Sequence, residues 1–517
     1  MRQLSRSMLR PYICPTCWRG IRPLRSGRRT YATVRAGAGV PDEIYDVVCV
    51  GGGPAGLALL AALRATPATS HLKVALIESQ DLRKARAWRL GSNEYANRCS
   101  SLTPSSVSFL ERIGAWRHVE QTRVQPYQEM HVWDGQNGSK ISFDWSAEMS
   151  PFEDQPRTVA TMLENANLVR GLLARIEELG GDKLSIFSRM TVRDIQNGGS
   201  VDDGPDLSAW PVLTLSPTTT EEKEGSAGQR TIAARLLVGA DGINSPVRAY
   251  ADITTHGWDY DRHGVVATLT VDRPVETASN VIRTAYQRFL PGLGGPIALL
   301  PLPNQAATMV WSTTVENATY LKSLPPEAFV AMVNAAFRLS MTDLRYMMTL
   351  DPSGSAGETH ESALEWRLQH THQPHPYILP PRVTAVQPGT TASFPLRFRH
   401  ASAYISPRVC LVGDAAHVIH PLGGQGLNLG LGDVAALVDT LSYAVEHGMD
   451  VGDVLALEPY AAKRYLANTK VSAACDLLHK LYNVDMAWHP LVWGRGFGVD
   501  LLDRMDLVKG WIMKQVD

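Results

Sequence analysis

The sequence predicts an α/β fold: a mostly parallel sheet with covering helices, interrupted by an antiparallel β-sheet domain and followed by a C-terminal helical segment. Three observations support this prediction. A short apolar run near residue 50 ends in a glycine-rich turn and continues as an apolar helix, two further apolar runs end in glycine-rich loops near residues 239 and 413, and β-rich runs alternate with turns between those two loops. The length of 517 residues is enough for two or three structural units.

The first 35 residues differ in composition from the rest of the chain. They contain nine arginines and no acidic residue, whereas the remainder carries 41 Lys+Arg against 51 Asp+Glu. An arginine-rich, acid-free N-terminus is typical of a mitochondrial transit peptide, and the stretch Arg29-Thr30-Tyr31-Ala32 resembles a matrix-peptidase cleavage site. A disordered basic arm is the alternative interpretation. The acidic remainder argues against nucleic-acid binding.

The hydrophobic content of 44% and charged content of 20% are typical of a folded globular chain. No segment reaches the roughly 18 uninterrupted apolar residues that a membrane-spanning helix requires. We therefore expect any membrane contact to be peripheral.

The first glycine-rich turn lies in YDVVCVGGGPAGLALLAALRA, which begins at Tyr45. The run 47–50 predicts a buried strand, Gly51, Gly53 and Gly56 fit the pattern GxGxxG, and the residues from Pro54 and Ala55 onward predict a helix. The glycines allow a tight turn and close approach of a pyrophosphate to the helix N-terminus. The next predicted strand, KVALIE, ends at Glu78, where an acid accepts hydrogen bonds from ribose hydroxyls. Together these features predict dinucleotide binding.

Two later loops repeat the arrangement of a strand end followed by glycines and an acid. LLVGADGINSPVRAY, residues 236–250, contains Asp241 and Gly242, and GDAAHVIHPLGGQGLNLGLGD, residues 413–433, leads into a helix predicted from Leu427. Such loops bring backbone N–H groups up to an anion or a polarised carbonyl. Neither is a second GxGxxG, so no separate nicotinamide domain is expected.

These three motifs resemble, in order and spacing, the FAD motifs of the aromatic-ring hydroxylases typified by para-hydroxybenzoate hydroxylase. Within that superfamily the chain is most similar to the mitochondrial ring hydroxylases of ubiquinone (coenzyme Q) biosynthesis. The supporting stretches are NRCSSLTPSSVSFLERIGAW (97–116), MLENANLVRGLL (162–173) and ASFPLRFRHA (392–401). The resemblance covers nearly everything from residue 44 to about 500. It implies a Rossmann-type FAD-binding domain with an interleaved antiparallel substrate domain.

The resemblance also implies which residues bind FAD. Asp414 is expected to accept from a ribityl hydroxyl, and the loop 423–428 is expected to aim N–H groups at the pyrimidine edge of the flavin ring. Arg98 and Asn165 fall where the family has further contacts, their alternatives being a surface arginine and a helix N-cap. The expected cofactor-binding residues are Gly51, Gly53, Pro54, Ala55, Gly56, Glu78, Arg98, Asn165, Asp241, Gly242, Asp414, Pro421, Gly424, Gln425, Gly426, Leu427 and Asn428.

No metal site is predicted. Cys14 and Cys17 form a CxxC pair in the leader without two further ligands nearby. The segment with His370, His372 and His375 contains prolines and lacks a fourth ligand, which favours a solvated loop. His417 and His420 belong to the third motif and are expected to be structural, with a proton-transfer role as the alternative.

The domain boundaries expected from these motifs divide the chain into five parts. Residues 1–35 form the transit peptide, 36–250 the first part of the FAD-binding domain with a polar surface insert at 197–230, 251–390 the β-sheet substrate domain, 391–450 the last part of the FAD-binding domain, and 451–517 a helical region. Residues 475–517 combine tryptophans with lysines and arginines. This pattern suits docking to a membrane or a complex, or packing against the main body.

The function implied by the resemblance is FAD-dependent hydroxylation of a polyprenylated phenol or hydroxybenzoate with O2, through a flavin hydroperoxide. The cofactor carries the chemistry, so no catalytic protein residue is assigned. Substrate residues are expected near 285–300, where Arg288 precedes an apolar run that is alternatively a strand–turn–strand core. The electron donor is either ferredoxin with its reductase or NADPH.

The implied location is the matrix side of the mitochondrial inner membrane, as a peripheral member of a coenzyme Q biosynthetic complex. Two alternatives stay open. One is a class A flavin hydroxylase of secondary metabolism, and the other is a non-enzymatic prenyl-binding or scaffold protein on the same fold.

Overall fold

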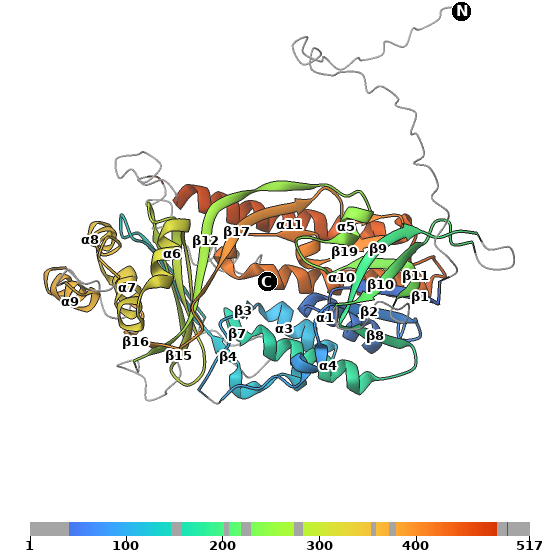
Figure 1. Cartoon of the computed structure of the whole chain (residues 1–517), viewed down its shortest axis with the longest axis horizontal. Coiled ribbons are helices and arrows are strands. Elements are labelled where there is room, and N and C mark those ends of the chain that lie inside the picture. Colours follow the sequence, from blue (N-terminus) through green and yellow to red (C-terminus); the bar gives the residue numbers. More distant parts are fainter. Residues whose placement is uncertain are drawn as a thin grey trace, which may run out of the picture. The chain divides into compact units, whose positions relative to one another are not determined.

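The computed structural model describes residues 41–91, 93–145, 157–200, 206–218, 229–272, 283–352, 358–371, 379–482 and 494. The expected transit peptide, its CxxC pair, and His372 and His375 lie outside these residues. In the described part of the chain the strands form an eight-stranded, a nine-stranded and a three-stranded sheet, here called the first, second and third sheets (Figure 1).

The first sheet is largely parallel and has the strand order β18-β19-β11-β1-β2-β8. β1 pairs in parallel with both β11 and β2, β11 with β19, and β2 with β8. β1, β2 and β11 are apolar because both faces of this sheet are covered. The bounds are β1 Glu43–Val50, β2 Val74–Glu78, β8 Leu184–Ser188, β11 Arg230–Gly239, β18 Ile405–Ser406 and β19 Val409–Leu411.

The helices of this sheet follow its strands and pack closely on one another. α1 contacts α4 and α10, and its alanines and leucines are buried throughout. α10 packs on α11, whose buried side faces the body of the protein. The bounds are α1 Pro54–Ala65, α2 Leu82–Arg86, α3 Pro104–Arg112, α4 Asn165–Leu179, α5 Pro246–Tyr250, α10 Gln425–Glu446 and α11 Val454–Tyr482.

The second sheet has the order β20-β17-β12-β15-β14-β13-β5-β6, with β16 paired to β12. All of its pairings are antiparallel except that of β13 with β5. Its strands are β5 Glu129–Asp134, β6 Lys140–Asp144, β12 Thr255–Val271, β13 Thr284–Leu290, β14 Gly295–Pro301, β15 Ala306–Thr314, β16 Val383–Val386, β17 Ala392–Ala401 and β20 His417–Val418. β5, β6 and β17 thus join this sheet, although the sequence places them with the FAD-binding segments.

Helices cover one face of the second sheet, although the sequence predicts only strands and turns in this region. α7 buries Phe329, Met332 and Phe337 against Val265, Trp311 and neighbouring strand residues in one core. The signal for α7 was present, because Pro325-Pro326-Glu327 begins a run with apolar residues at helical spacing. The bounds are α6 Val315–Ser323, α7 Pro326–Arg338, α8 Met341–Met347 and α9 His360–His370.

The insert 197–230 is not a single surface loop. β9 (Met190–Asn197) pairs antiparallel with β10 (Pro211–Pro217), which pairs antiparallel with β11, so the insert contains the middle strand of a meander. Leu213 and Leu215 in β10 are fully buried. The apolar run PVLTL is short and lies between two long polar stretches, so the sequence pattern did not reveal the strand.

His370 is the last residue of α9 and not part of a loop. Its Nδ1 lies 2.7 Å from the carbonyl oxygen of Trp366, and the two rings stack with centroids 4.4 Å apart. No helix among the described residues is long and apolar enough to cross a bilayer. The described residues also contain no cluster of three or more residues with metal-ligating side chains.

Candidate functional site

The three glycine-rich loops meet at one edge of the first sheet. β1, β2, β11 and β19 run in the same direction, so their carboxyl ends lie together. A cavity of about 670 Å3 lies at this edge. Its lining residues are Val50, Gly51, Gly53, Pro54, Ala55, Ile77, Glu78, Ser79, Gln80, Ser100, Asn165, Met190, Thr191, Ala240, Asp241, Gly242, Pro246, Val412, Gly413, Asp414, Gly426, Leu427 and Gly430.

The turn between β1 and α1 requires glycine for steric reasons. Gly51 has φ +107°, and a Cβ on it would overlap the backbone carbonyl of Ala240 in the second loop. A Cβ on Gly56 would overlap the carbonyl of Gly51. A Cβ on Gly53, by contrast, would meet no protein atom within 4 Å, because Gly53 faces the cavity. Gly51 and Gly56 are therefore required by the backbone packing, whereas Gly53 leaves space in the cavity.

Three helices begin at the cavity without a side-chain cap. The N-cap positions are Gly53 for α1, Glu164 for α4 and Gly424 for α10, and none supplies a side-chain hydrogen bond to the first turn. α3, α5, α8 and α9, in contrast, are capped by serine or threonine. Uncapped N–H groups and the positive end of the helix dipole favour an anionic ligand.

Glu78 closes the cavity at the end of β2. Its Oε2 accepts a hydrogen bond from the N–H of Gly52 at 2.5 Å, and its Oε1 accepts from the N–H of Gln80 at 2.7 Å. The carboxylate is therefore held by backbone donors on both sides while its edge lines the cavity. This orientation suits a hydrogen-bond acceptor for ribose hydroxyls.

Asp241 presents a buried oxygen without a partner. Its Oδ2 accepts from the N–H of Val247 at 3.3 Å, whereas its Oδ1 makes no hydrogen bond. Burial raises the pKa of this carboxyl, against the opposing effect of hydrogen bonds from Ser245 and Val247. An unsatisfied buried acceptor costs free energy unless a bound group donates to it, which makes Asp241 a fitting ligand residue.

Arg248 links the second and third loops. Its Nη1 donates to the carbonyl of Ala415 at 2.8 Å, and its Nη2 donates to the carbonyl of Ile243 at 2.6 Å. Arg248 thus fixes the positions of Asp241 and Asp414 relative to each other, although its own side chain is absent from the cavity lining.

Asp414 lies in a short 3-10 turn, Gly413–Ala415, directly after β19. Its side chain is exposed to the cavity, but the surrounding protein removes bulk water, and this desolvation raises the pKa of the carboxyl while His417 lowers it. Asp414 lines the same cavity as Gly51 and Asp241, and its expected contact with a ribityl hydroxyl stays a prediction.

A buried carboxylate supports the third loop from behind. Asp433, fully buried in α10, accepts hydrogen bonds from the N–H of Gly413 at 3.1 Å and from Nε2 of His417 at 2.6 Å. Its other oxygen accepts from Arg464 and Asn468 of α11, each at 2.8 Å. Burial raises the pKa of Asp433, but His417, Arg464 and Asn468 outweigh it and hold the pKa below 3.8. Asp433 therefore ties α11 to the loop that carries Asp414.

Asn165 and Ser100 form the opposite wall, where the third sheet meets α4. This sheet has the order β3-β7-β4, with bounds β3 Cys99–Leu102, β4 Gln125–Tyr127 and β7 Ala160–Glu164. Ser100 donates from Oγ to Oδ1 of Asn165 at 2.6 Å. Asn165 is the first residue of α4, and Glu164 is the N-cap, so the N-cap alternative for Asn165 is wrong.

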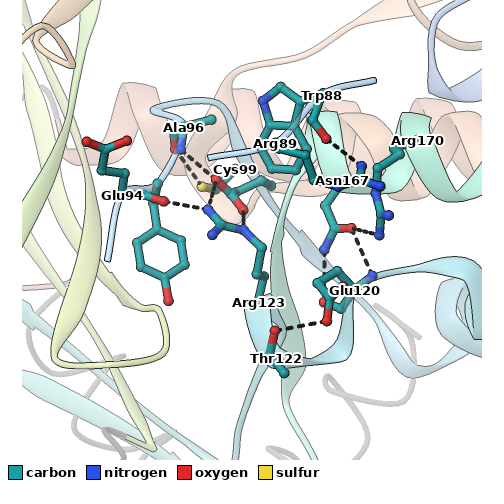
Figure 2. Close-up of polar contacts among 12 residues, drawn as sticks. Trp88, Arg89, Glu94, Ala96, Cys99, Glu120, Thr122, Arg123, Asn167 and Arg170 are labelled. Carbon is teal, nitrogen blue, oxygen red and sulfur yellow. Dashed lines mark hydrogen bonds and ion pairs between the residues drawn. The ribbon is translucent and has the colours of Figure 1, made fainter. Parts of the chain in front are cut away.

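A buried ion pair fixes this wall. Glu164 is fully buried and accepts from Nε of Arg123 at 2.7 Å and from the N–H of Ala96 at 2.6 Å. Arg123 also donates to the carbonyl of Glu94 (Figure 2) and to the carbonyl of Gly91. The hydrogen bond to Glu164 is the main reason why the pKa of the Arg123 guanidinium is raised above its ordinary value. Gly91 and the segment 93–98, which includes Arg98, are thereby held against the start of α4.

Six of the expected cofactor residues do not line the cavity: Gly56, Arg98, Pro421, Gly424, Gln425 and Asn428. Arg98 is an exposed side chain, and only its carbonyl has a contact here, with the N–H of Asn165 at 3.0 Å. Asn428 is buried and accepts from the N–H of Thr103 at 3.0 Å while donating to the carbonyl of Ser101 at 2.8 Å. Asn428 thus joins α10 to β3.

The sequence did not identify Ser100, Arg123, Glu164, Arg464 or Asn468 as residues that build the site. Ser100 is a small polar residue without a motif of its own. The other four act through partners 31 to 41 positions away along the chain. No periodic pattern connects such pairs.

His420, in the third motif, is fully buried between this loop and α11, and neither ring nitrogen has a hydrogen-bond partner. Burial and, next in size, the nearby His479 lower its pKa to about 3. The ring is therefore neutral at physiological pH and packs edge-on against Tyr260 with centroids 5.1 Å apart.

Arg288 lies in β13 and lines a second cavity of about 270 Å3, which shares no lining residue with the cavity of the first sheet. It is buried and donates to the carbonyls of Ala336 and Leu339 at 2.9 and 2.8 Å, at the carboxyl end of α7. Burial lowers its pKa to about 10. An arginine in this position satisfies carbonyl groups at the end of a helix, and the expected substrate contact near Arg288 stays a prediction.

The cavity fits a dinucleotide. Its volume lies within the range of about 300–1,000 Å3 that is common for ligand sites. Uncapped helix ends suit the phosphates, and the carboxylates of Glu78, Asp241 and Asp414 suit hydroxyl groups along the molecule.

Comparisons with known proteins give the family. The family model described as FAD binding domain matches residues 44–473. The mitochondrial ubiquinone biosynthesis monooxygenase COQ6 of Schizosaccharomyces pombe is 38% identical over 478 residues, which cover 91% of each chain. The COQ6 protein of Homo sapiens is 35% identical over 472 residues, which cover 91% of this chain and 92% of the human protein.

Solved structures show the same fold at low sequence identity. The p-nitrophenol 4-monooxygenase PnpA of Pseudomonas putida DLL-E4 has a TM-score of 0.59 at 17% identity, covering 92% of this chain and 98% of its own. PqsL, a probable FAD-dependent monooxygenase of Pseudomonas aeruginosa, has a TM-score of 0.56 at 20% identity, with 87% and 99% covered. The chain therefore belongs to the family of the COQ6 ubiquinone biosynthesis monooxygenases and is an FAD-dependent aromatic monooxygenase.

Proposed function

We propose that this protein hydroxylates the ring of a polyprenylated phenol or hydroxybenzoate intermediate in ubiquinone biosynthesis, with FAD held in the cavity of the first sheet. The observation that carries the proposal is the meeting of three glycine-rich loops and three carboxylates around one cavity, in a chain of this family. The names of the relatives support the pathway. The geometry of the cavity supports the roles proposed for individual residues.

The adenosine diphosphate half of FAD would lie between the first loop and Glu78. The N-terminus of α1 faces the cavity without a side-chain cap and would bind the pyrophosphate. Glu78 would accept from the ribose hydroxyls, its orientation held by Gly52 and Gln80. Oδ1 of Asp241 and the carboxylate of Asp414 would accept from hydroxyl groups nearer the flavin ring.

The N-terminus of α10 would face the ring itself. Gly426 and Leu427 line the cavity in the first turn of this helix, where N–H groups have no intrahelical partner. When bound and reduced, the flavin supplies the activation of O2 and the transfer of one oxygen atom to an electron-rich ring carbon. The helix end would stabilise the negative charge of the reduced state by about 0.3–2 kcal/mol.

The remaining tasks of the protein are positioning and water exclusion. We assign no protein nucleophile, because the cofactor carries the reactive chemistry. The second sheet would hold the phenol ring at attack distance and keep bulk water away. Ordered placement of this kind accounts for several kcal/mol of a barrier, about 7–11 kcal/mol at most.

Partners and location belong to the same proposal. The relatives are named as mitochondrial proteins, and we propose that residues 1–35 act as the transit peptide and that the mature protein lies on the matrix side of the inner membrane. Residues 451–517 would dock it to that membrane or to a coenzyme Q biosynthetic complex. The electron donor would be ferredoxin with its reductase, with NADPH as the alternative.

The test uses the purified chain without residues 1–35. We expect a yellow protein that releases FAD on denaturation, accepts electrons anaerobically from one of the two donor systems, and adds one oxygen atom to a prenylated phenol, as measured by mass spectrometry. Faster hydroxylation of short phenols without a prenyl chain than of the prenylated phenol would favour a hydroxylase of secondary metabolism. Absence of FAD from folded protein would overturn the proposal in favour of a prenyl-binding or scaffold protein.

A further inference from the structure

The outer face of α11 carries a line of exposed leucines. Leu455, Leu466 and Leu477 are 66%, 58% and 66% exposed, and we call them the leucine stripe. They are spaced by 11 residues, which is about three helical turns, so they lie one above another along the helix. The stripe extends over about 33 Å at a rise of about 1.5 Å per residue.

In the part of the chain that the structure describes, none of the three stripe leucines belongs to a hydrophobic core. The buried side of α11 carries Tyr460, Asn468, Ser472, Cys475 and His479, which lie on the opposite side of the helix. A surface helix normally has polar residues on its outer face, because only one apolar side is needed to pack on the core. In α11 the leucines occupy the outer side instead, and their exposure is a cost that the folded chain itself does not offset.

Positive charge flanks the stripe. The exposed charged residues of α11 are one glutamate, Glu458, and three lysines, Lys463, Lys470 and Lys480. Lys480 lies 2.8 Å from Asp476, and its Nζ is 4.4 Å from the centre of the Trp258 ring, which is itself 41% exposed. Leucine, tryptophan and lysine side by side are the combination found where a helix lies in a membrane interface.

We propose that the leucine stripe binds an anionic lipid surface, with α11 lying parallel to the plane of the bilayer. The exposed lysines favour an anionic surface, and the exposed leucines and Trp258 favour one that also takes up apolar side chains, which the interface of an anionic bilayer provides. This inference rests on the proposed function in one respect: a polyprenylated substrate is dissolved in the bilayer. It goes beyond that function by naming the surface and its ligand.

The same helix is bonded to the cavity loop. Arg464 and Asn468 contact Asp433, which accepts from the N–H of Gly413 next to Asp414. At the other end of α11, Tyr482 stacks on Phe289 of β13 with centroids 3.7 Å apart and planes 15° apart. A bilayer on the stripe would therefore lie one helix diameter from the flavin loop and beside the second sheet, a short path for a prenylated ring.

The experiment measures flotation of the FAD-loaded chain with two kinds of vesicle: phosphatidylcholine alone, and phosphatidylcholine with an equal amount of phosphatidylglycerol. The test variants are L455Q/L466Q/L477Q and K463Q/K470Q. The matched control is I186Q/V315Q/W366Q, which removes exposed apolar side chains of 41%, 42% and 58% exposure from other elements. Flavin content and hydroxylation of a detergent-dissolved phenol are measured for every variant, so loss of activity is separated from loss of lipid binding.

We expect the wild type and the control to bind the anionic vesicles and the leucine variant to lose at least about tenfold in partitioning. The lysine variant should lose the preference for anionic lipid and its sensitivity to salt. Unchanged binding of the leucine variant would overturn the inference. So would wild-type dimers that dissociate only in the leucine variant, because the stripe would then bind a second copy. Normal flotation without any hydroxylation would leave the lipid surface supported and the proposed function contradicted.

Discussion

Arg123 and Glu164 form a bidentate ion pair in which both side chains are buried, with Nε and Nη2 of the arginine 2.7 and 2.9 Å from the two carboxylate oxygens. The guanidinium also lies 4.6 Å from the centre of the Tyr95 ring. Tyr95 in turn bonds through its backbone to Gln387, beyond β16 of the second sheet. This pair therefore joins the cavity wall to the sheet expected to hold the substrate.

Replacing Arg123 by Met should destabilise the protein strongly. The change leaves the carboxylate of Glu164 buried without its cation, which costs about 3–5 kcal/mol. We expect a lower melting temperature and weaker FAD retention, and partial recovery of both in R123M/E164Q. The control is R382M, which removes an ion pair that is 51% exposed on each side and worth about 0–1 kcal/mol. Equal effects of R123M and R382M would contradict a stabilising role for the buried pair.

Alanine at Gly56 and at Gly53 should have different consequences. In Gly56→Ala the new methyl group overlaps the carbonyl of Gly51, so β1 and α1 move apart and the protein loses stability with or without FAD. In Gly53→Ala the methyl group meets no protein atom within 4 Å and points into the cavity, so the FAD-free protein keeps its melting temperature but binds FAD weakly.

Both glycine variants are compared with wild type by thermal unfolding before and after FAD is removed. A Gly53→Ala protein that retains FAD normally would show that the pyrophosphate lies elsewhere.

The substitution Asp414→Asn should weaken FAD binding without unfolding the protein. The variant replaces a charged acceptor in the cavity wall by an amide, and hydrogen bonds to charged groups contribute about 1.5–3 kcal/mol, roughly ten- to a hundredfold in Kd. Fluorescence titration of the FAD-free protein measures this change. The matched control is D439N, an exposed aspartate of α10 that is absent from the cavity wall. Loss of affinity in D439N as well would point to a general charge effect.

The Asp433 network should make stability depend on pH in the acid range. The folded protein holds the pKa of Asp433 below its ordinary value of 3.8. A carboxyl with a lowered pKa stabilises the fold above its ordinary pKa and loses that contribution as the pH falls through the folded value. Asp433→Asn should therefore melt at a lower temperature than wild type at neutral pH, and the difference should narrow below pH 3.8.

Melting curves of the wild type and D433N at pH 7 and at about pH 3 test this prediction. A difference that is the same at both pH values would mean that the charge of Asp433 does not contribute.

The family, the cofactor and the three loops of the cavity could be predicted from the amino-acid sequence. Gly51 and Gly56 are readable from the sequence because their requirement is local: a strand must turn into a helix where another backbone approaches, and only hydrogen fits there. Glu78, Asp241 and Asp414 are readable because each lies at a strand end or within three residues after one. In a parallel sheet these ends lie along one edge.

The residues that support those loops, and the assignment of strands to the two large sheets, could not be predicted without the folded chain. The partners of Asp433 and Glu164 come from segments far away in the chain, and β5, β6 and β17 join the second sheet through pairings with distant strands. The burial of Arg288 at the end of α7 and the exposure of the leucines of α11 also could not be predicted from the sequence. A residue type fixes what a side chain is able to bind, but its partner is set by burial and strand register, which depend on the whole folded chain.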